Sequence, residues 1–219
     1  MYKTGELVAQ RIESYCRTWR LWIENAEGVI SGDSIMSADS SMQATSLSDD
    51  IELGAVCSQS WNMTISDTET AFLGKEYDTY MYLVDYETNG ILADEKIPMG
   101  RFTCVKSKKS GGSVQLTMAD RLYFSDKPYV PHIPMPNWNK AVEDDICRQL
   151  GLQNGNDYTE VRLLRDKNGR RLIDKNGKVL YSKYFYFKVS SVPKDVTMRQ
   201  MLSYLASAQG EFGYVDRYG

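Results

Sequence analysis

The chain has 219 residues, of which 42% are hydrophobic and 25% are charged, and its formal net charge is −3. This composition is typical of a soluble globular protein with one large or two small domains, and it argues against intrinsic disorder. The lack of a basic excess argues against a dedicated nucleic-acid binder, and no apolar run approaches the ~20 residues that span a bilayer.

The first segments predict a helix followed by a strand. Val8, Ile12 and Tyr15 share one face of a short amphipathic helix over residues 4–15, and residues 1–13 lack the apolar core of a signal peptide. We therefore expect synthesis in the cytoplasm. Residues 18–24 alternate with period two and predict a strand, in which Trp22 is an apolar residue on the polar face.

The following hundred residues predict further strands joined by turns. Residues 31–50 are rich in Ser, Asp and Thr and predict a loop with one edge strand near residues 43–46. Strands are predicted over residues 51–67, 79–86, 97–105 and 114–118, with a tight turn at residues 89–90 and a hairpin loop over residues 106–113. The first 120 residues thus predict five to six strands in a sandwich or barrel.

Four prolines, at positions 128, 131, 134 and 136, predict a boundary before a mixed α/β region. A helix is predicted over residues 138–150, with Asn137 as N-cap, Gly151 as C-cap, and Trp138, Val142, Ile146 and Leu150 on its buried face. Residues 152–189 predict a small meander that ends in a long aromatic strand over residues 181–189.

The last residues predict a second helix and the start of a strand. Thr197 and Gln200 can form a capping box, Met198, Met201, Leu202 and Leu205 form the buried face, and Gly210 ends the helix. Residues 212–216 predict a strand, after which the chain stops in an apparent turn. Since such a strand needs a return partner, we expect this sequence to be the front part of a longer protein.

The candidate catalytic residues do not form a recognisable catalytic system. His132 is the sole histidine and lies among prolines, which favours a loop residue over a general base. Asp49-Asp50 and the run Glu143, Asp144 and Asp145 offer carboxylates for a hydrolase. The run of three falls in the first turns of a helix, where negative charge is stabilised, and this favours a solvated helix face.

Metal, phosphate and nucleic-acid sites are likewise disfavoured. The repeated Asp-Lys-Asn-Gly at residues 166–169 and 174–177 resembles a calcium loop superficially, but it lacks the closing glutamate, and tight turns explain it. Cys16, Cys57, Cys104 and Cys147 form no CxxC pair and predict buried, reduced thiols. Lys106, Lys108 and Lys109 predict a solvated hairpin tip, and Gly111-Gly112 lacks the helix and lysine of a phosphate loop.

Three stretches resemble a known family. They are "IELGAVCSQSWNMTI" at residues 51–65, "IPMGRFTCVKSKKSGGSVQLTMADRL" at residues 97–122, and the last helix with Ala208-Gln209-Gly210 and its strand. Together with the N-terminal "RTWRLWIEN", they resemble the N-terminal part of prophage tail proteins of Gram-positive bacteria, in the baseplate hub and tail-associated (tail tip) protein family. Residues 153–184 carry this resemblance least.

The resemblance implies a mainly β (α+β) fold. It implies an N-terminal antiparallel β-barrel of the tail-tube type over residues 1–127, then a smaller α/β domain with two helices and a β-meander over residues 128–219, incomplete at its C-terminus. The implied function is a virion structural protein of the phage or prophage tail tip, part of a baseplate hub ring that docks to the tail tube. The implied partners are further copies of itself, as a homotrimer, and other tail proteins, with no specific nucleic acid and no membrane insertion.

On this interpretation the protein is not an enzyme, and we expect no catalytic, cofactor-binding or metal site. Trp22, Tyr80, Tyr82 and Tyr86 point outward, either to subunit contacts or under the chain's own loops. Two other functions stay open. They are a tail-associated cell-wall hydrolase, which needs a carboxylate pair or metal in a cleft, and a host carbohydrate-binding receptor module, which the many tyrosines favour.

Overall fold

The computed structural model describes residues 18–43, 54–66, 71–84, 96–156, 161–163, 166, 168, 170–179, 181–183, 186–211 and 213–216. The helix predicted over residues 4–15, Cys16, Asp49-Asp50, Tyr86 and the turn at residues 89–90 lie outside these ranges. Contacts divide the chain into a first unit, Met1–Ala44, Cys57–Tyr123 and Tyr214–Gly219, and a second unit, Thr45–Val56 and Phe124–Gly213.

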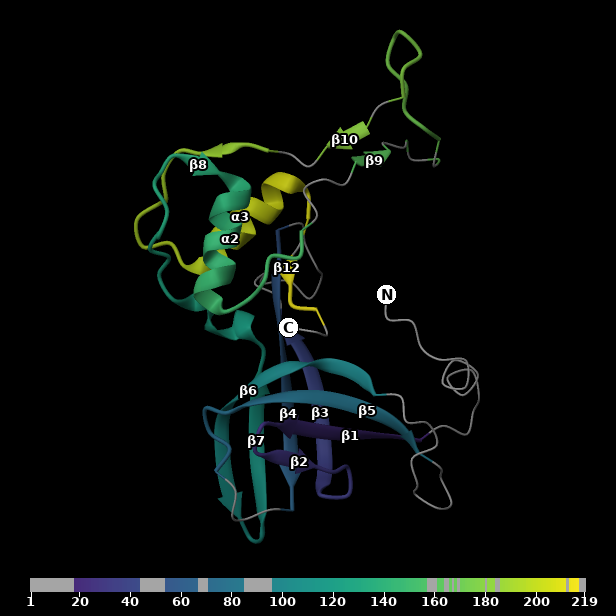
Figure 1. Cartoon of the computed structure of the whole chain (residues 1–219), viewed down its shortest axis with the longest axis vertical. Helices are drawn as coiled ribbons and strands as arrows, with labels where there is room; N and C mark the ends of the chain where they lie inside the picture. The colour runs from purple at the N-terminus through teal and green to yellow at the C-terminus, as the bar shows by residue number, and fades with distance from the viewer. Residues whose placement is uncertain are drawn as a thin grey trace. The chain divides into compact units, whose positions relative to one another are not determined.

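The first unit is built on a curled antiparallel sheet (Figure 1). Its strands are β1 (Thr18–Asn25), β2 (Gly28–Ile30), β3 (Ile35–Gln43), β4 (Val56–Ile65), β5 (Glu76–Val84), β6 (Ile97–Ser110) and β7 (Ser113–Ala119). The order is β12-β4-β7-β6-β5-β1-β2, β12 being Gly213–Tyr214, and β3 also pairs with β4. The expectation of a mainly β fold is confirmed.

The core of the first unit lies on one face of this sheet, as the period-two pattern requires. Its buried residues include Leu21, Ile23, Met63, Ile65, Phe72, Tyr77, Phe102, Val114, Leu116 and Met118. Residues at alternate positions of a strand point to the same side, so the residues between them form the opposite face.

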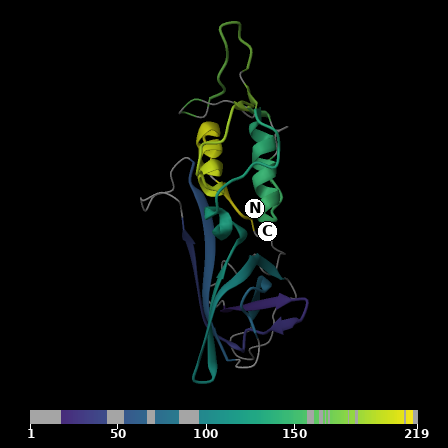
Figure 2. The same ribbon diagram turned by 90° about the vertical axis from the view of Figure 1, so that its left-hand side faces the viewer.

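Two predictions for this sheet are wrong. Residues 35–42, predicted as loop, belong to β3, which pairs with β4 from Ile35↔Ile65 to Gln43↔Ser58 with a register shift between Ile35 and Ser37. Of the edge strand predicted near residues 43–46, Gln43 ends β3, and residues 44–46 lie outside the described ranges. Residues 106–110, also predicted as loop, continue β6 as far as Ser110. The hairpin to β7 (Figure 2) therefore turns on Gly111 and Gly112 alone, both at positive φ.

Gly100 lies at a bulge in β6, within residues 97–122. It has φ +138°, and a Cβ at this position would lie 2.7 Å from Cε2 of Phe102. Its carbonyl accepts a hydrogen bond from the hydroxyl of Thr79 at 2.9 Å, where the register between β5 and β6 shifts. This bulge requires glycine.

The second unit contains two helices that lie side by side in both views (Figures 1 and 2). They are α2 (Asn139–Leu150), with Gly151 as left-handed C-cap, and α3 (Met198–Gln209), with Gly210 in the same role. The predicted capping box of Thr197 and Gln200 is confirmed. The predicted N-cap Asn137 is wrong, because Trp138 occupies that position and the side chain of Asn137 accepts the N–H of Trp138 instead.

The remaining strands of the second unit are short. β8 (Asn137–Trp138) pairs with β11 (Lys188–Val189), and β9 (Val161–Leu163) pairs with β10 (Tyr181–Lys183). The single long strand predicted over residues 181–189 is therefore wrong, since its two ends pair in different sheets. A 3-10 helix, Arg121–Asp126, follows β7, and no described helix is long and apolar enough to cross a membrane.

Candidate functional site

The outer face of the first unit, opposite the core, gathers aromatic and charged side chains from three neighbouring strands. We define it by Arg20, Trp22 and Glu24 of β1, Glu76, Asp78, Tyr80 and Tyr82 of β5, and Arg101 and Thr103 of β6. The register places these residues opposite one another, as in Trp22↔Tyr80 and Asp78↔Arg101. Cross-strand neighbours on one face are close enough to interact, so the register itself builds this surface.

Aromatic rings occupy the β1–β5 part of the outer face. The rings of Trp22 and Tyr82 meet edge to face with centroids 4.7 Å apart. The Nζ of Lys96 lies 4.9 Å from the centre of the Tyr80 ring. All three aromatic side chains are half-buried, so each packs on a neighbour of this chain while part of its surface stays open to solvent.

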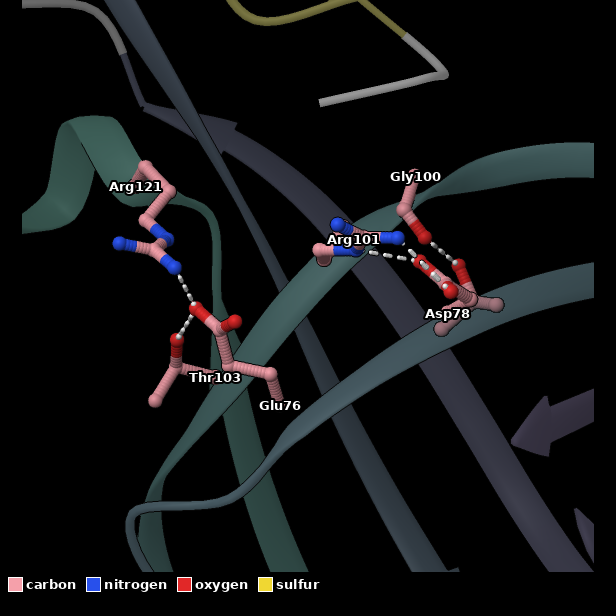
Figure 3. A network of polar contacts seen from close by, with 7 residues as sticks. Glu76, Asp78, Gly100, Arg101, Thr103 and Arg121 are labelled. Atoms are coloured by element: carbon pink, nitrogen blue, oxygen red, sulfur yellow. Dashed lines mark hydrogen bonds and ion pairs between the residues drawn. The ribbon is translucent and has the colours of Figure 1, made fainter. Parts of the chain in front are cut away.

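Ion pairs neutralise the charges on the same face. Arg101 binds Asp78 with two hydrogen bonds, of 2.6 and 3.0 Å (Figure 3). Glu76 pairs with Arg121 and accepts a bond of 3.4 Å from the hydroxyl of Thr103 (Figure 3). Such paired charges cost less to bury against another surface than isolated ones.

A second group of ion pairs joins side chains of β1 to residues outside that strand. Lys96 donates to both carboxylate oxygens of Glu24, at 2.9 and 3.2 Å, and Arg20 pairs with Asp33. The hydrogen bond to Glu24 raises the pKa of Lys96, and the bond to Asp78 raises that of Arg101. Burial, then the charge of Asp78, raises the pKa of the Tyr80 hydroxyl. These groups therefore hold their charge states across the neutral range.

The candidate hydrolase carboxylates are not on a solvated helix face, and that prediction is wrong. Asp145 of α2 is fully buried and Glu143 is 4% exposed, whereas Asp144 is half-buried and pairs with Lys140 at 2.6 Å. The carboxylates of Glu143 and Asp145 instead accept hydrogen bonds from polar groups of the same unit. These groups lie in the proline-rich segment, in the segment after α2 and in α3, so the two carboxylates hold these parts of the unit together.

Asp145 fixes the proline-rich segment. Its Oδ2 accepts hydrogen bonds from the hydroxyl of Tyr129 at 3.0 Å, from the backbone N–H of His132 at 3.0 Å and from the amide of Gln149 at 3.1 Å. The guanidinium of Arg148 lies 3.6 Å from Oδ1. The exposed His132 thus contributes its backbone to this arrangement.

Glu143 fixes the segment after α2. It accepts hydrogen bonds from the side-chain amides of Asn156 at 3.1 Å and Asn154 at 3.5 Å, and of Gln209 in α3 at 2.6 Å. Burial raises the pKa of Glu143 above its ordinary value of 4.5, and these amides partly offset that effect. Because desolvation is the largest of these effects, Glu143 holds its proton to a higher pH in the folded protein than in the unfolded chain.

A Glu143→Gln variant is expected to gain stability relative to the native chain as the pH rises. An acid whose folded pKa is raised loses stabilising free energy when the pH rises from its unfolded pKa through its folded pKa. The glutamine does not titrate, so the difference between the two unfolding free energies shifts in its favour as the pH rises above the ordinary glutamate pKa of 4.5. Urea unfolding at a series of pH values measures this. Asp144→Asn is the control, and a difference that is flat with pH for Glu143→Gln contradicts the prediction.

The aspartates of the two Asp-Lys-Asn-Gly segments make the same pair of hydrogen bonds to their own backbone. Oδ1 of Asp166 accepts the N–H groups of Asn168 and Arg170 at 2.8 and 2.9 Å. Oδ1 of Asp174 accepts those of Asn176 and Lys178, both at 2.8 Å. One carboxylate oxygen in each turn is therefore already used by its own backbone, as the turn interpretation predicts.

The lysines and cysteines carry less information about function. Lys106, Lys108 and Lys109 are exposed as predicted, but on β6 rather than in a loop. Of the described cysteines, Cys57 and Cys104 are buried, Cys147 is half-buried, and all three are free thiols. Burial raises the pKa of Cys147 to about 11 and also raises that of Cys104, so both stay protonated at neutral pH.

Sequence patterns identified the aromatic members of the outer face but not its ion pairs. The alternation in β5 placed Tyr80 and Tyr82 together. Arg101 and Lys96 are distant in sequence from Asp78 and Glu24, and only the strand register joins them. The buried Asp120 was also missed. Its side chain accepts the N–H of Gln59 at 2.7 Å and that of Tyr123 at 3.1 Å, so it links β4 to the turn after β7.

Comparison with known proteins finds a distant likeness among solved structures. No known family model and no curated protein matches the chain. Among solved structures, it is similar to the crystal structure of the prophage MuSo2 43 kDa tail protein from Shewanella oneidensis, with a TM-score of 0.40 and 9% sequence identity. The match covers 90% of this chain and 50% of that one, so the chain spans half the length of that tail protein.

Proposed function

We propose that this chain is a structural, non-enzymatic part of a phage or prophage tail, and that it belongs to a tail-tip or baseplate hub ring docked to the tail tube. The proposal rests on the three family-like sequence stretches and on the curled antiparallel sheet to which the first two contribute long strands. Two of these stretches supply β4, β6 and β7, and their glycine and aspartate residues have defined structural roles at Gly100 and Asp120.

The outer face of the first unit is the observation that carries a role in assembly. Interfaces are enriched in aromatic residues, and charged residues are depleted at their centres, where an unpaired charge is costly to bury. On the outer face, Trp22, Tyr80 and Tyr82 lie beside carboxylates that are already paired with Lys96 and Arg101. A neighbouring subunit can therefore cover this face without leaving an uncompensated charge.

A Trp22→Ala variant is expected to lower the incorporation of the protein into tails by about thirtyfold, because an interface tryptophan contributes on the order of 2 kcal/mol. The measurement is quantitative immunoblotting of particles purified from the strain that carries the gene. Leu73→Ala is the matched control, since Leu73 is 66% exposed in the same unit and lies before β5, outside the outer face.

Thermal unfolding of both purified variants separates assembly from folding. The proposal requires that Trp22→Ala melts close to the control while its incorporation falls. Native levels of Trp22→Ala in the particles would contradict the role of the outer face. Release of soluble fragments from purified cell walls by this chain would contradict the non-enzymatic proposal.

A further inference from the structure

The second unit exposes an aromatic pair beside a lysine on the short β8–β11 sheet. Trp138 is 49% exposed and Tyr186 is 48% exposed. Their rings meet edge to face, with centroids 6.5 Å apart and planes at 88°. The Nζ of Lys188 lies 5.3 Å from the centre of the Trp138 ring. We call Trp138, Tyr186 and Lys188 the aromatic corner.

Backbone pairing holds the aromatic corner in place. Lys188 lies directly opposite Trp138 in the antiparallel pair of β8 and β11. The fully buried Asn139 donates its N–H to the carbonyl of Phe187 at 3.0 Å, and its side-chain oxygen accepts the N–H of Phe187 at 3.4 Å. The two strands are thus joined at the first residue of α2, so the rings and the ammonium group are pre-organised before any ligand arrives.

The prediction that Trp138 lies on the buried face of its helix is wrong. Val142, Ile146 and Leu150 of that face are buried, as predicted, whereas Trp138 precedes α2 and is open to solvent. Single exposed hydrophobic residues are common on protein surfaces. Two half-exposed aromatic rings in contact, with a cation over one of them, are a more specific arrangement.

The size of the aromatic corner favours a small ligand. A fully buried aromatic side chain contributes about 150–250 Å² of contact area, so two half-exposed rings offer on the order of 200 Å². A stable protein interface buries about 800 Å² on each partner. Two rings at right angles instead match one or two sugar rings, whose C–H groups pack on the negative face of an aromatic ring.

The charge of the aromatic corner selects the ligand further. Lys188 attracts an anionic substituent, and one lysine matches one such group, whereas a nucleic-acid strand draws its affinity from the neutralisation of several phosphates. We propose that Trp138, Tyr186 and Lys188 form a binding site for an anionic saccharide, meaning a sugar that bears a carboxylate or a phosphate. The sugar ring stacks on Trp138, Tyr186 borders it, and Lys188 binds the anionic group. This site is separate from the outer face and does not depend on the proposed role in tails.

Titration with three saccharides, two anionic and one neutral, tests the site. The probes are a hyaluronan tetrasaccharide, which carries carboxylates, glucose 6-phosphate, which carries a phosphate, and chitotetraose, which is neutral. Binding to the full chain is followed by isothermal titration calorimetry. We expect saturable binding of at least one anionic probe with a Kd on the order of 1 mM, and about tenfold weaker binding of chitotetraose.

Three variants assign the binding to the aromatic corner. Trp138→Ala is expected to abolish binding, and Lys188→Gln to reduce the affinity for the anionic probe to that for chitotetraose. Tyr204→Ala, which removes a 56% exposed tyrosine of α3, is expected to bind as the native chain does. Circular dichroism confirms that each variant folds.

Two results overturn the proposal. One is the absence of saturable binding of both anionic probes to the native chain, and the other is unchanged binding in Trp138→Ala. If Trp138→Ala also fails to assemble into tails while the native chain binds no saccharide, the aromatic corner contacts a protein instead. Since the Trp22→Ala experiment addresses a different unit, its outcome and this one are distinguishable.

Discussion

Asp145→Ala is expected to destabilise the second unit by about 3 kcal/mol, because it removes the shared acceptor of several buried hydrogen bonds. The Tyr129 hydroxyl, the His132 N–H and the Gln149 amide all donate to this one carboxylate oxygen. Burial and the bond to Asp145 raise the pKa of Tyr129, so its hydroxyl stays a donor throughout the neutral range. Urea unfolding monitored by circular dichroism measures the loss.

Two substitutions near Asp145 are expected to cause smaller losses of stability and serve as references. Tyr129→Phe removes one of the bonds and is expected to cost about 1 kcal/mol. Asp144→Ala removes the adjacent, half-buried carboxylate of the same helix and is expected to cost less than about 1 kcal/mol. If Asp145→Ala proves no more destabilising than Asp144→Ala, Asp145 does not anchor the proline-rich segment.

Gly54→Ala is expected to destabilise the second unit by about 3 kcal/mol, from a strained backbone and a steric clash together. Gly54 has φ +88°, and a Cβ there would lie 1.7 Å from the Oγ of Ser207 and 3.0 Å from the carbonyl oxygen of Ser203. Its N–H donates to the carbonyl of Glu211 at 2.6 Å, which prevents the segment from moving away from α3 without losing that bond.

Gly177→Ala is the matched control for Gly54→Ala. Gly177 has a similar φ of +78° in the same unit, but a Cβ at this position would have no described atom within 4 Å. Its substitution is expected to cost only the conformational penalty of about 1 kcal/mol. Equal losses for the two variants, measured by thermal unfolding, would show that contact with α3 does not restrict Gly54.

Local patterns in the sequence predicted the elements whose determinants are local. Alternation predicted β1, β4, β5 and β7, and the capping box of Thr197 and Gln200 marked the start of α3. β3 escaped prediction because its serine-rich sequence has no apolar alternation and is held by pairing with β4. The strand predicted over residues 181–189 was wrong because pairing partners distant in sequence divide it between two sheets.

In the candidate site, too, local patterns predict some residues and the pairing of distant strands determines the others. Alternation alone assigns Tyr80 and Tyr82 of β5 to one face, but their charged neighbours depend on the register with β1 and β6. Glu143 and Asp145 were predicted on a solvated face because their partners lie outside the helix pattern, at Gln209 and Tyr129. Helix-dipole arguments place charge near an N-terminus, but they do not determine whether loops cover it.

Immunogold electron microscopy of tail particles tests the central proposal most directly. The particles are induced from the strain that carries the gene and are labelled with antibody raised against this chain. We predict gold at the distal end of the tails, where a tail-tip or hub ring lies. Tails that remain unlabelled at both intact and disrupted tips would contradict the proposed function.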